Sequence, residues 1–291
     1  MDISTFVFFD IETTGLPHEE RNQTKIIELT FLAVSAKEIE VTSIGEIPLV
    51  NKLSLFFNPE RDISEEAANM TRLSETLLAI QPTFKERVKT LNSFLEELPK
   101  PVCLVAHNGN RFDFKILTAE YKDVNAKFPR DLLCVDSITG FRELDKKNKT
   151  INNNHRQKTK PLCVRSPKRT IESIMTDDED EWPELNISIE EWREIDDMTM
   201  SMSSMSCEED EKDTSGEKGK SNKVHTAKER VSYTLSSLYR RLLQKEPINT
   251  HRSEVDCILL LECVVATKSF FLPWANKNAK LLSSIKPLSR Y

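Results

Sequence analysis

The sequence predicts an α/β fold, in which a mixed five-stranded sheet is flanked by helices and a long disordered insertion interrupts the chain. Three features support this prediction: short apolar runs rich in aromatic and β-branched residues, amphipathic segments between the later runs, and a charged low-complexity stretch after residue 150. Runs that are apolar throughout are typical of strands buried on both faces. Strands that alternate with helices favour parallel neighbours, whereas short links favour an antiparallel meander.

The five strands are expected at the apolar runs in the first half of the chain. Short links join the first three, so we expect these strands to form the antiparallel meander. The other two runs follow predicted helices and end at His107 and Asp136. The predicted strands are residues 6–12, 26–34, 53–57, 102–106 and 132–135.

Helices are expected between and after these strands. Residues 83–98 carry apolar side chains at helical spacing, and Pro99 and Pro101 end this helix. Ser64 and Ser74 are expected to cap two short helices. Further helices are predicted at residues 111–121, 137–144, 235–242 and 255–267. Beyond them, Pro273-Trp274 and residues 285–287 are expected to lie in a tail packed on the surface.

The charge distribution predicts one domain, formed by residues 1–149 and 226–291, around an insertion at residues 150–225. Residues 146–170 contain nine Lys and Arg, whereas residues 171–216 contain seventeen Asp and Glu against two basic residues. Such a segment buries too little apolar surface to offset the entropy of the chain, so disorder is expected. Because the net charge is only −6, the rest of the chain is basic, which is compatible with phosphate binding.

Composition argues against several other classes of protein. No apolar run approaches the length of a membrane span, and the N-terminus lacks the basic region of a signal peptide. The six cysteines are scattered without a Cys-x-x-Cys pair, which indicates free thiols in a reducing compartment and makes a zinc site improbable. We therefore expect a protein of the nucleus or cytoplasm with no membrane partner.

Carboxylates cluster at three predicted strand or helix ends. Asp10 and Glu12 are two residues apart at the end of the first strand, so both point to one face. Asp113 follows the fourth strand, and Asp256 is the charge that the last long helix carries into an apolar core. A bare Asp-x-Glu is more often a helix cap and a solvated acid. Buried together, however, these four acids would repel one another and favour a hard divalent cation.

His251 lies five residues before Asp256, at the entrance to the same predicted helix. A lone His there is usually a cap or a surface residue, so its interest depends on convergence of the four acids. Four acids suit two Mg²⁺ ions, or Mn²⁺ in their place, an arrangement used for in-line attack on phosphodiesters. A neutral His beside them can accept the proton of the attacking water.

Three motifs in this order resemble those of the DEDD exonuclease superfamily in its His-bearing branch. They are Asp10-Ile-Glu12-Thr-Thr-Gly, Asn108-Gly-Asn-Arg-Phe-Asp113-Phe and His251-Arg-Ser-Glu-Val-Asp256. Stretches outside the motifs resemble the three-prime repair DNA exonucleases more closely. These stretches are residues 52–55, 104–109, 134–138, 233–239 and 285–287. The resemblance covers residues 4–145 and 230–291 but not the insertion.

The resemblance implies an RNase H-like fold, a homodimer built through sheet edges, and metal-dependent removal of nucleotides from DNA 3′ ends, single-stranded or frayed. It implies that Asp10, Glu12, Asp113 and Asp256 are the metal ligands and His251 the general base. It also implies a substrate-binding set of Thr13, Leu16, Pro17, Met70, His107 and Phe112. One departure is Val255, which stands where the family usually has glycine.

Alternatives remain open at this point. Exoribonucleases and polymerase-associated proofreading subunits share the three motifs, and a catalytically inactive nucleic-acid-binding protein is a third possibility. For the insertion, we hypothesise that the basic part binds the DNA backbone while the acidic part competes for the same lysines and arginines. The plain alternative is a solvated linker without effect on catalysis.

Overall fold

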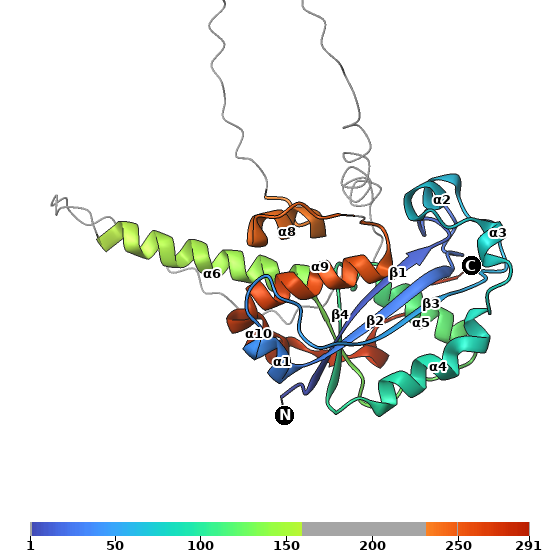
Figure 1. Ribbon diagram of the computed structural model, residues 1–291, viewed down its shortest axis with the longest axis horizontal. Coiled ribbons are helices and arrows are strands. Elements are labelled where there is room, and N and C mark those ends of the chain that lie inside the picture. Colours follow the sequence, from blue (N-terminus) through green and yellow to red (C-terminus); the bar gives the residue numbers. More distant parts are fainter. Residues whose placement is uncertain (1, 159–230, 249, 291) are drawn as a thin grey trace, which may run out of the picture. The chain divides into compact units, whose positions relative to one another are not determined.

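The computed structural model describes residues 2–158, 231–248 and 250–290 (Figure 1). A six-stranded mixed sheet runs through it in the order β3-β2-β1-β4-β5-β6. Strands β1, β4 and β5 are parallel neighbours, whereas β2 and β3 form the predicted antiparallel meander with β1. The strands span Thr5–Thr13, Ile26–Ser35, Asn51–Phe56, Val102–Ala106, Leu133–Asp136 and Lys280–Leu281.

All five predicted strands are confirmed, and the sheet has one strand more than predicted. The additional strand, β6, consists of two exposed residues that pair antiparallel with β5. Two residues are too short for any alternation of apolar and polar side chains, so the sequence carried no signal for this strand.

Helices cover both faces of the sheet. The helices are α1 to α6 and α8 to α10, with the bounds Ala36–Val41, Glu65–Thr71, Glu75–Leu78, Phe84–Glu97, Asp113–Asp123, Ser137–Lys158, Leu235–Leu243, Ser253–Ala266 and Lys268–Asn278. A short 3₁₀ helix, Leu282–Ser284, follows β6. The predicted caps are confirmed, because Ser64 and Ser74 accept backbone hydrogen bonds at the starts of α2 and α3.

Side chains along β1 point alternately to the two faces of the sheet and so contribute to two separate parts of the core. Phe6 and Phe8 pack with the apolar side of α9 and with α8, α10 and the start of α6. Val7, Phe9 and Ile11 pack on the opposite face with α4 and α5. Asp10 and Glu12 continue the row of Phe6 and Phe8. The acids therefore lie on the face that α9 covers.

Two expectations for the second half of the chain are wrong. Pro273 and Trp274 lie in a regular helix, α10, where Phe271 is fully buried and Trp274 is only 7% exposed. Pro273 removes one hydrogen bond of this helix, and burial of the neighbouring apolar side chains in the core holds the helix nonetheless. Helix α6 extends to Lys158, beyond the predicted end at 144. The predicted domain boundaries stay a prediction. The rest of the predicted insertion, from residue 159, lies outside the described residues.

Gly140 allows α6 and α10 to approach closely. A Cβ at this position would lie 2.8 Å from the Trp274 ring. Helix propensity alone would make Gly140→Ala stabilising by about 1 kcal/mol. Because a rigid, buried ring blocks the methyl group, we expect destabilisation of about 1–3 kcal/mol instead, measured by urea unfolding. The control is Asn148→Ala at an exposed position of the same helix. Stabilisation by Gly140→Ala would contradict the close packing of the two helices.

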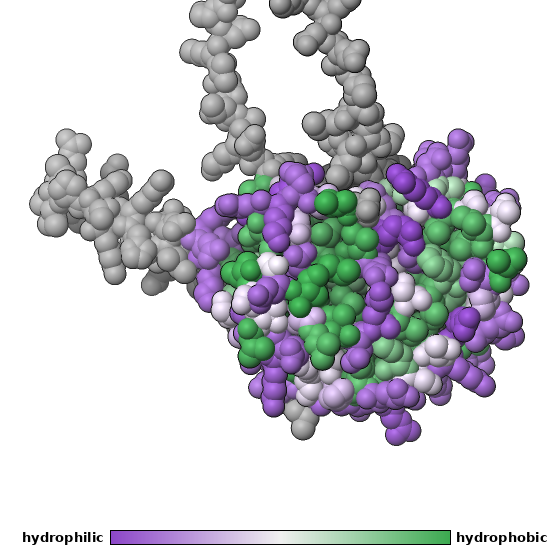
Figure 2. Space-filling view, in the orientation of Figure 1, coloured by the Kyte–Doolittle hydropathy of each residue, from purple (hydrophilic) through white to green (hydrophobic). Residues whose placement is uncertain are grey.

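Within the described residues, no helix is long and apolar enough to cross a membrane. Figure 2 shows apolar patches among hydrophilic side chains on the face that Figure 1 presents. Large exposed apolar side chains also mark the end of α1 and the link that follows it before β3, namely Val41, Ile44, Ile47 and Leu49.

Candidate active site

Two rows of side chains that run across β1, β2 and β3 contain Asp10 and Glu12. In the register of β1, β2 and β3, Asp10 lies opposite Thr30 and Ser54, while Glu12 lies opposite Glu28 and Phe56. Directly paired residues of neighbouring strands point to the same face. The register shifts just after Glu12, because Thr13 pairs with Ile26 and Ile27 of β2 is left without a partner on β1. The rows therefore end at an irregularity in the pairing of β1 with β2, beneath the start of α9.

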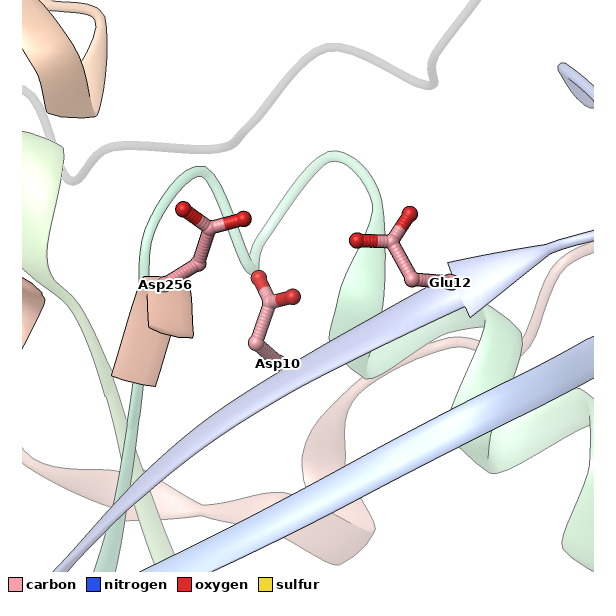
Figure 3. Close-up of side chains that lie close together, drawn as sticks. All are labelled: Asp10, Glu12 and Asp256. Carbon is pink, nitrogen blue, oxygen red and sulfur yellow. The ribbon is translucent and has the colours of Figure 1, made fainter. Parts of the chain in front are cut away.

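Three of the four predicted metal ligands meet at this point (Figure 3). Carboxylate oxygens of Asp10, Glu12 and Asp256 lie within 4.8 Å of one another. Burial and the repulsion of neighbouring acids raise the pKa of Asp10 and of Glu12 well above their ordinary values. Burial raises the pKa of Asp256 to about 7. Such a cluster of oxygen ligands has the chemistry that Mg²⁺ and Mn²⁺ prefer.

Asp113 is the first residue of α5 and lies beside this group rather than within it. Its side chain is only 3% exposed, and burial, followed by repulsion from Asp136 and Asp256, raises its pKa to about 8. The charge of Asp113 in turn raises the pKa of Asp10 and Glu12. The fourth acid is thus coupled electrostatically to the other three, although its oxygens lie outside the set that meets within 4.8 Å.

His251 stands on the bend that leads into α9. Its backbone has a positive φ of 69°, and its N–H donates to Asp256 Oδ2 at 3.0 Å. The side chain is half-buried, and burial lowers its pKa. A lowered pKa leaves the imidazole neutral at physiological pH, in the form that can accept a proton. Val255 is accommodated within α9, one residue before Asp256.

Leu16 and Pro17 of the predicted nucleotide-contact set follow closely after the carboxyl end of β1. Pro17 is buried, Leu16 and Phe112 are half-buried, and Met70 is 40% exposed. The N–H of Ser64, the cap of the helix that carries Met70, donates to the Thr14 carbonyl at 2.7 Å. This contact ties that helix to the end of β1. The predicted contacts of Leu16, Pro17, Met70 and Phe112 with a nucleotide are not tested by the structure and stay predictions.

Two further members of the predicted substrate-binding set have internal partners. The Thr13 hydroxyl donates to the Gly15 carbonyl at 3.0 Å. The ring nitrogens of His107 lie 2.9 Å from Ser137 Oγ and 2.8 Å from the Tyr233 carbonyl oxygen. Burial lowers the pKa of His107 to about 4. His107 therefore links the end of β4 to α6 and to Tyr233. Because both ring nitrogens have partners, only the face of the ring is left to contact a substrate.

Sequence reasoning missed three residues that support the site. Asp136, at the end of β5, accepts N–H groups of Asn108, Asn110 and Ile138 at 3.0–3.1 Å and shapes the loop that leads to Asp113. Glu28 and Arg252 form a two-pronged ion pair beside the carboxylates, with N···O distances of 3.0 and 3.1 Å. Each of the two acids is a charge in or next to an apolar strand, and that was the available signal.

The raised pKa values predict the pH dependence of stability without metal. An acid whose pKa is raised in the folded protein holds a proton that the unfolded chain has lost, so stability falls as the pH rises towards the folded pKa. With Asp256 near 7 and Asp113 near 8, we expect stability in EDTA to fall between pH 6.5 and 8.5. Chemical denaturation measures the fall, and added Mg²⁺ should reverse it. Equal stability at both pH values in EDTA would contradict the raised pKa values of Asp113 and Asp256.

Comparison with known proteins connects this site to a family. The exonuclease family matches residues 7–160, which is more than half of the chain. Human three prime repair exonuclease 2 is 40% identical over 151 residues, covering 49% of this chain and 63% of the relative. Mouse three prime repair exonuclease 2 is 27% identical over 293 residues, covering 98% of this chain and 92% of the relative. The chain thus spans less than two thirds of the first of these relatives.

A solved structure supports the fold alone. Cell-death related nuclease 4 superimposes with a TM-score of 0.50 over 96% of this chain and 66% of that chain, at 11% sequence identity.

Proposed function

Because the chain belongs to the exonuclease family and is related to the three-prime repair exonucleases, we propose that it removes nucleotides from DNA 3′ ends by metal-dependent phosphodiester hydrolysis. The observation that carries this proposal is the meeting of the half-buried Asp10, Glu12 and Asp256, with the buried Asp113 beside them. Acids in this arrangement repel one another unless a cation compensates their charge. A pathway in the nucleus or cytoplasm is part of the same proposal.

We propose that the carboxylates hold two Mg²⁺ ions, with Mn²⁺ as a substitute. Every ligand is a carboxylate oxygen, which suits hard divalent cations. Asp10, Glu12 and Asp256 would hold the ions together with Asp113. When bound, the ions would supply the positive charge that stabilises the attacking and leaving oxygens of the phosphodiester. Arg252 is a cation that lowers the pKa of Glu12. It is held in an ion pair with Glu28 and therefore does not take the place of the metal ions.

The side chains of the protein would act on the proton and on the terminal nucleotide. His251, neutral because burial lowers its pKa, would accept the proton of the attacking water. The hydrogen bond from its N–H to Asp256 ties the position of the base to that of a metal ligand. Leu16, Pro17, Met70 and Phe112 would hold the face of the last base by apolar contact, which tolerates any base.

The homodimer is proposed on the position of β3 in the sheet. This strand pairs only with β2 among the described strands, so its outer edge is open to another strand. Exposed apolar side chains precede it, among them Ile47 and Leu49. Light scattering of the purified protein tests the proposal. A monomeric mass at micromolar concentration would contradict it.

End-labelled oligonucleotides test the proposed activity. We expect release of mononucleotides from 3′-labelled single-stranded DNA in Mg²⁺, and loss of release in EDTA. A 5′-labelled strand should shorten stepwise. An RNA strand of the same sequence is the comparison that separates a deoxyribonuclease from an exoribonuclease. First release of label from the 5′ end, or cleavage in EDTA, would refute the proposal.

A further inference from the structure

Arg252 and Glu28 form an ion pair next to the metal-ligand candidates. Arg252 donates from Nε and Nη2 to the two carboxylate oxygens of Glu28, at 3.0 and 3.1 Å. Glu28 is 1% exposed, and the guanidinium group lies 5.5 Å from the centre of the Phe56 ring. A planar, two-pronged contact of this kind fixes direction as well as distance.

The pair joins the segment that carries His251 to the sheet beneath it. Arg252 follows His251 directly and precedes the first residue of α9. Glu28 lies on β2 and is paired across the sheet with Glu12. The charge of Glu28 raises the pKa of Asp10, Glu12 and Asp256, while Arg252 lowers that of Glu12. Without its partner, Glu28 would therefore be a fifth uncompensated acid at the site.

The next two residues of the same segment are also bound to the sheet. Ser253 is hydrogen-bonded to Thr30 at 2.8 Å, and Thr30 to Ser54 at 2.9 Å. Glu254 pairs with Lys52 at 2.5 Å, but this pair is exposed. The contacts of Arg252 and Ser253 thus follow the two cross-strand rows that contain Glu12 and Asp10. His251, on its positive-φ bend, is placed by the residues that come directly after it.

We infer that Arg252 and Glu28 are positioning residues, which hold His251 over the metal site and keep the fifth carboxylate out of the ligand set. This inference depends on the proposed role of His251 as the base. The competing explanation is that the pair is purely structural, although buried ion pairs contribute little net stability on average. The two explanations differ in what they predict for kcat.

Kinetics of four variants test the inference: Arg252→Met, Arg252→Lys, Glu28→Gln and the double variant Arg252→Met with Glu28→Gln. A displacement of about 1 Å costs about 100-fold in rate, so we expect Arg252→Met to lower kcat by about 10- to 100-fold with KM little changed. Arg252→Lys keeps the charge without the planar fork and should recover only part of the loss. The double variant should be no slower than the slower single variant, because one contact is lost in all of them. Glu28→Gln keeps the shape of the side chain and serves where Arg252→Met fails to fold.

Glu254→Gln is the matched control, because it makes the same substitution in the exposed pair of the same segment. Its kcat should stay within about threefold of the parent, as expected for exposed pairs. In a His251→Ala background, Arg252→Met should cost less than about threefold further, since it acts through His251. A kcat within threefold of the parent for both Glu28→Gln and Arg252→Met overturns the inference, and so does a full further loss in the His251→Ala background. Full activity of His251→Ala itself would instead refute the proposed base.

Discussion

Asp113→Asn is expected to lower turnover at least about a thousandfold, because a metal-bound transition state loses several kcal/mol when one ligand charge is removed. Asp113 is the stringent choice among the four acids, since its oxygens lie beside the group of three rather than within it. The fold should persist, because Asn has the same shape. In EDTA at pH 8.5 the variant should be more stable than the parent by about 1–3 kcal/mol, since burial raises the pKa of Asp113 to about 8.

Release of mononucleotides from 3′-labelled DNA and chemical denaturation give the two readouts. Asp131→Asn is the matched control: the residue is exposed, and its positive φ of 59° is one that Asn adopts readily. This control should have the activity of the parent. Asp113→Asn with activity within tenfold of the parent would remove Asp113 from the ligand set and leave three acids.

His251→Ala is expected to lower kcat by about two to four orders of magnitude, the range typical of general-base removal. In the parent, kcat should rise as the pH increases through the pKa of His251, which burial lowers below its ordinary value. The variant should lose this acidic limb of the pH profile while its affinity for DNA, measured with Ca²⁺ in place of Mg²⁺, changes little. An unchanged acidic limb in His251→Ala would assign His251 a structural role.

Much of the fold is predictable from local patterns. Strands β1, β2 and β4 are buried on both faces and therefore appear as mostly apolar runs. The amphipathic spacing between Phe84 and Leu98 predicts α4, and its end before Pro99 is confirmed. These elements follow from periodicity that a few neighbouring residues determine.

Elements stabilised by distant contacts are not predictable in the same way. Helix α10 contains Pro273, which argues locally against a helix, yet Phe271 packs against Phe141 of α6 and Trp274 packs against Phe271. Strand β6 forms by antiparallel pairing with the edge of β5. In both cases the stabilising partner is more than a hundred residues away in the sequence.

Some residues of the site are likewise predictable from the sequence, whereas others are not. Asp10, Glu12, Asp113 and Asp256 interrupt apolar segments at their ends, so their interest is visible in the sequence. Glu28 and Arg252 are 224 residues apart, and their pairing depends on the register of β2 against β1 and on the entry of α9. The internal hydrogen bonds of His107 are likewise invisible before the fold is known, because its partner Tyr233 follows residues 159–230 in the chain.

Binding of Mn²⁺ to the protein, measured as the loss of the free-ion signal in electron paramagnetic resonance, tests the central claim most directly. The account predicts saturable binding of two ions per chain at neutral pH. Asp10→Asn should weaken it strongly, and Asp131→Asn should bind as the parent does. Saturable binding of one ion or none at millimolar Mn²⁺ by the parent protein would contradict a two-metal carboxylate centre at the end of β1.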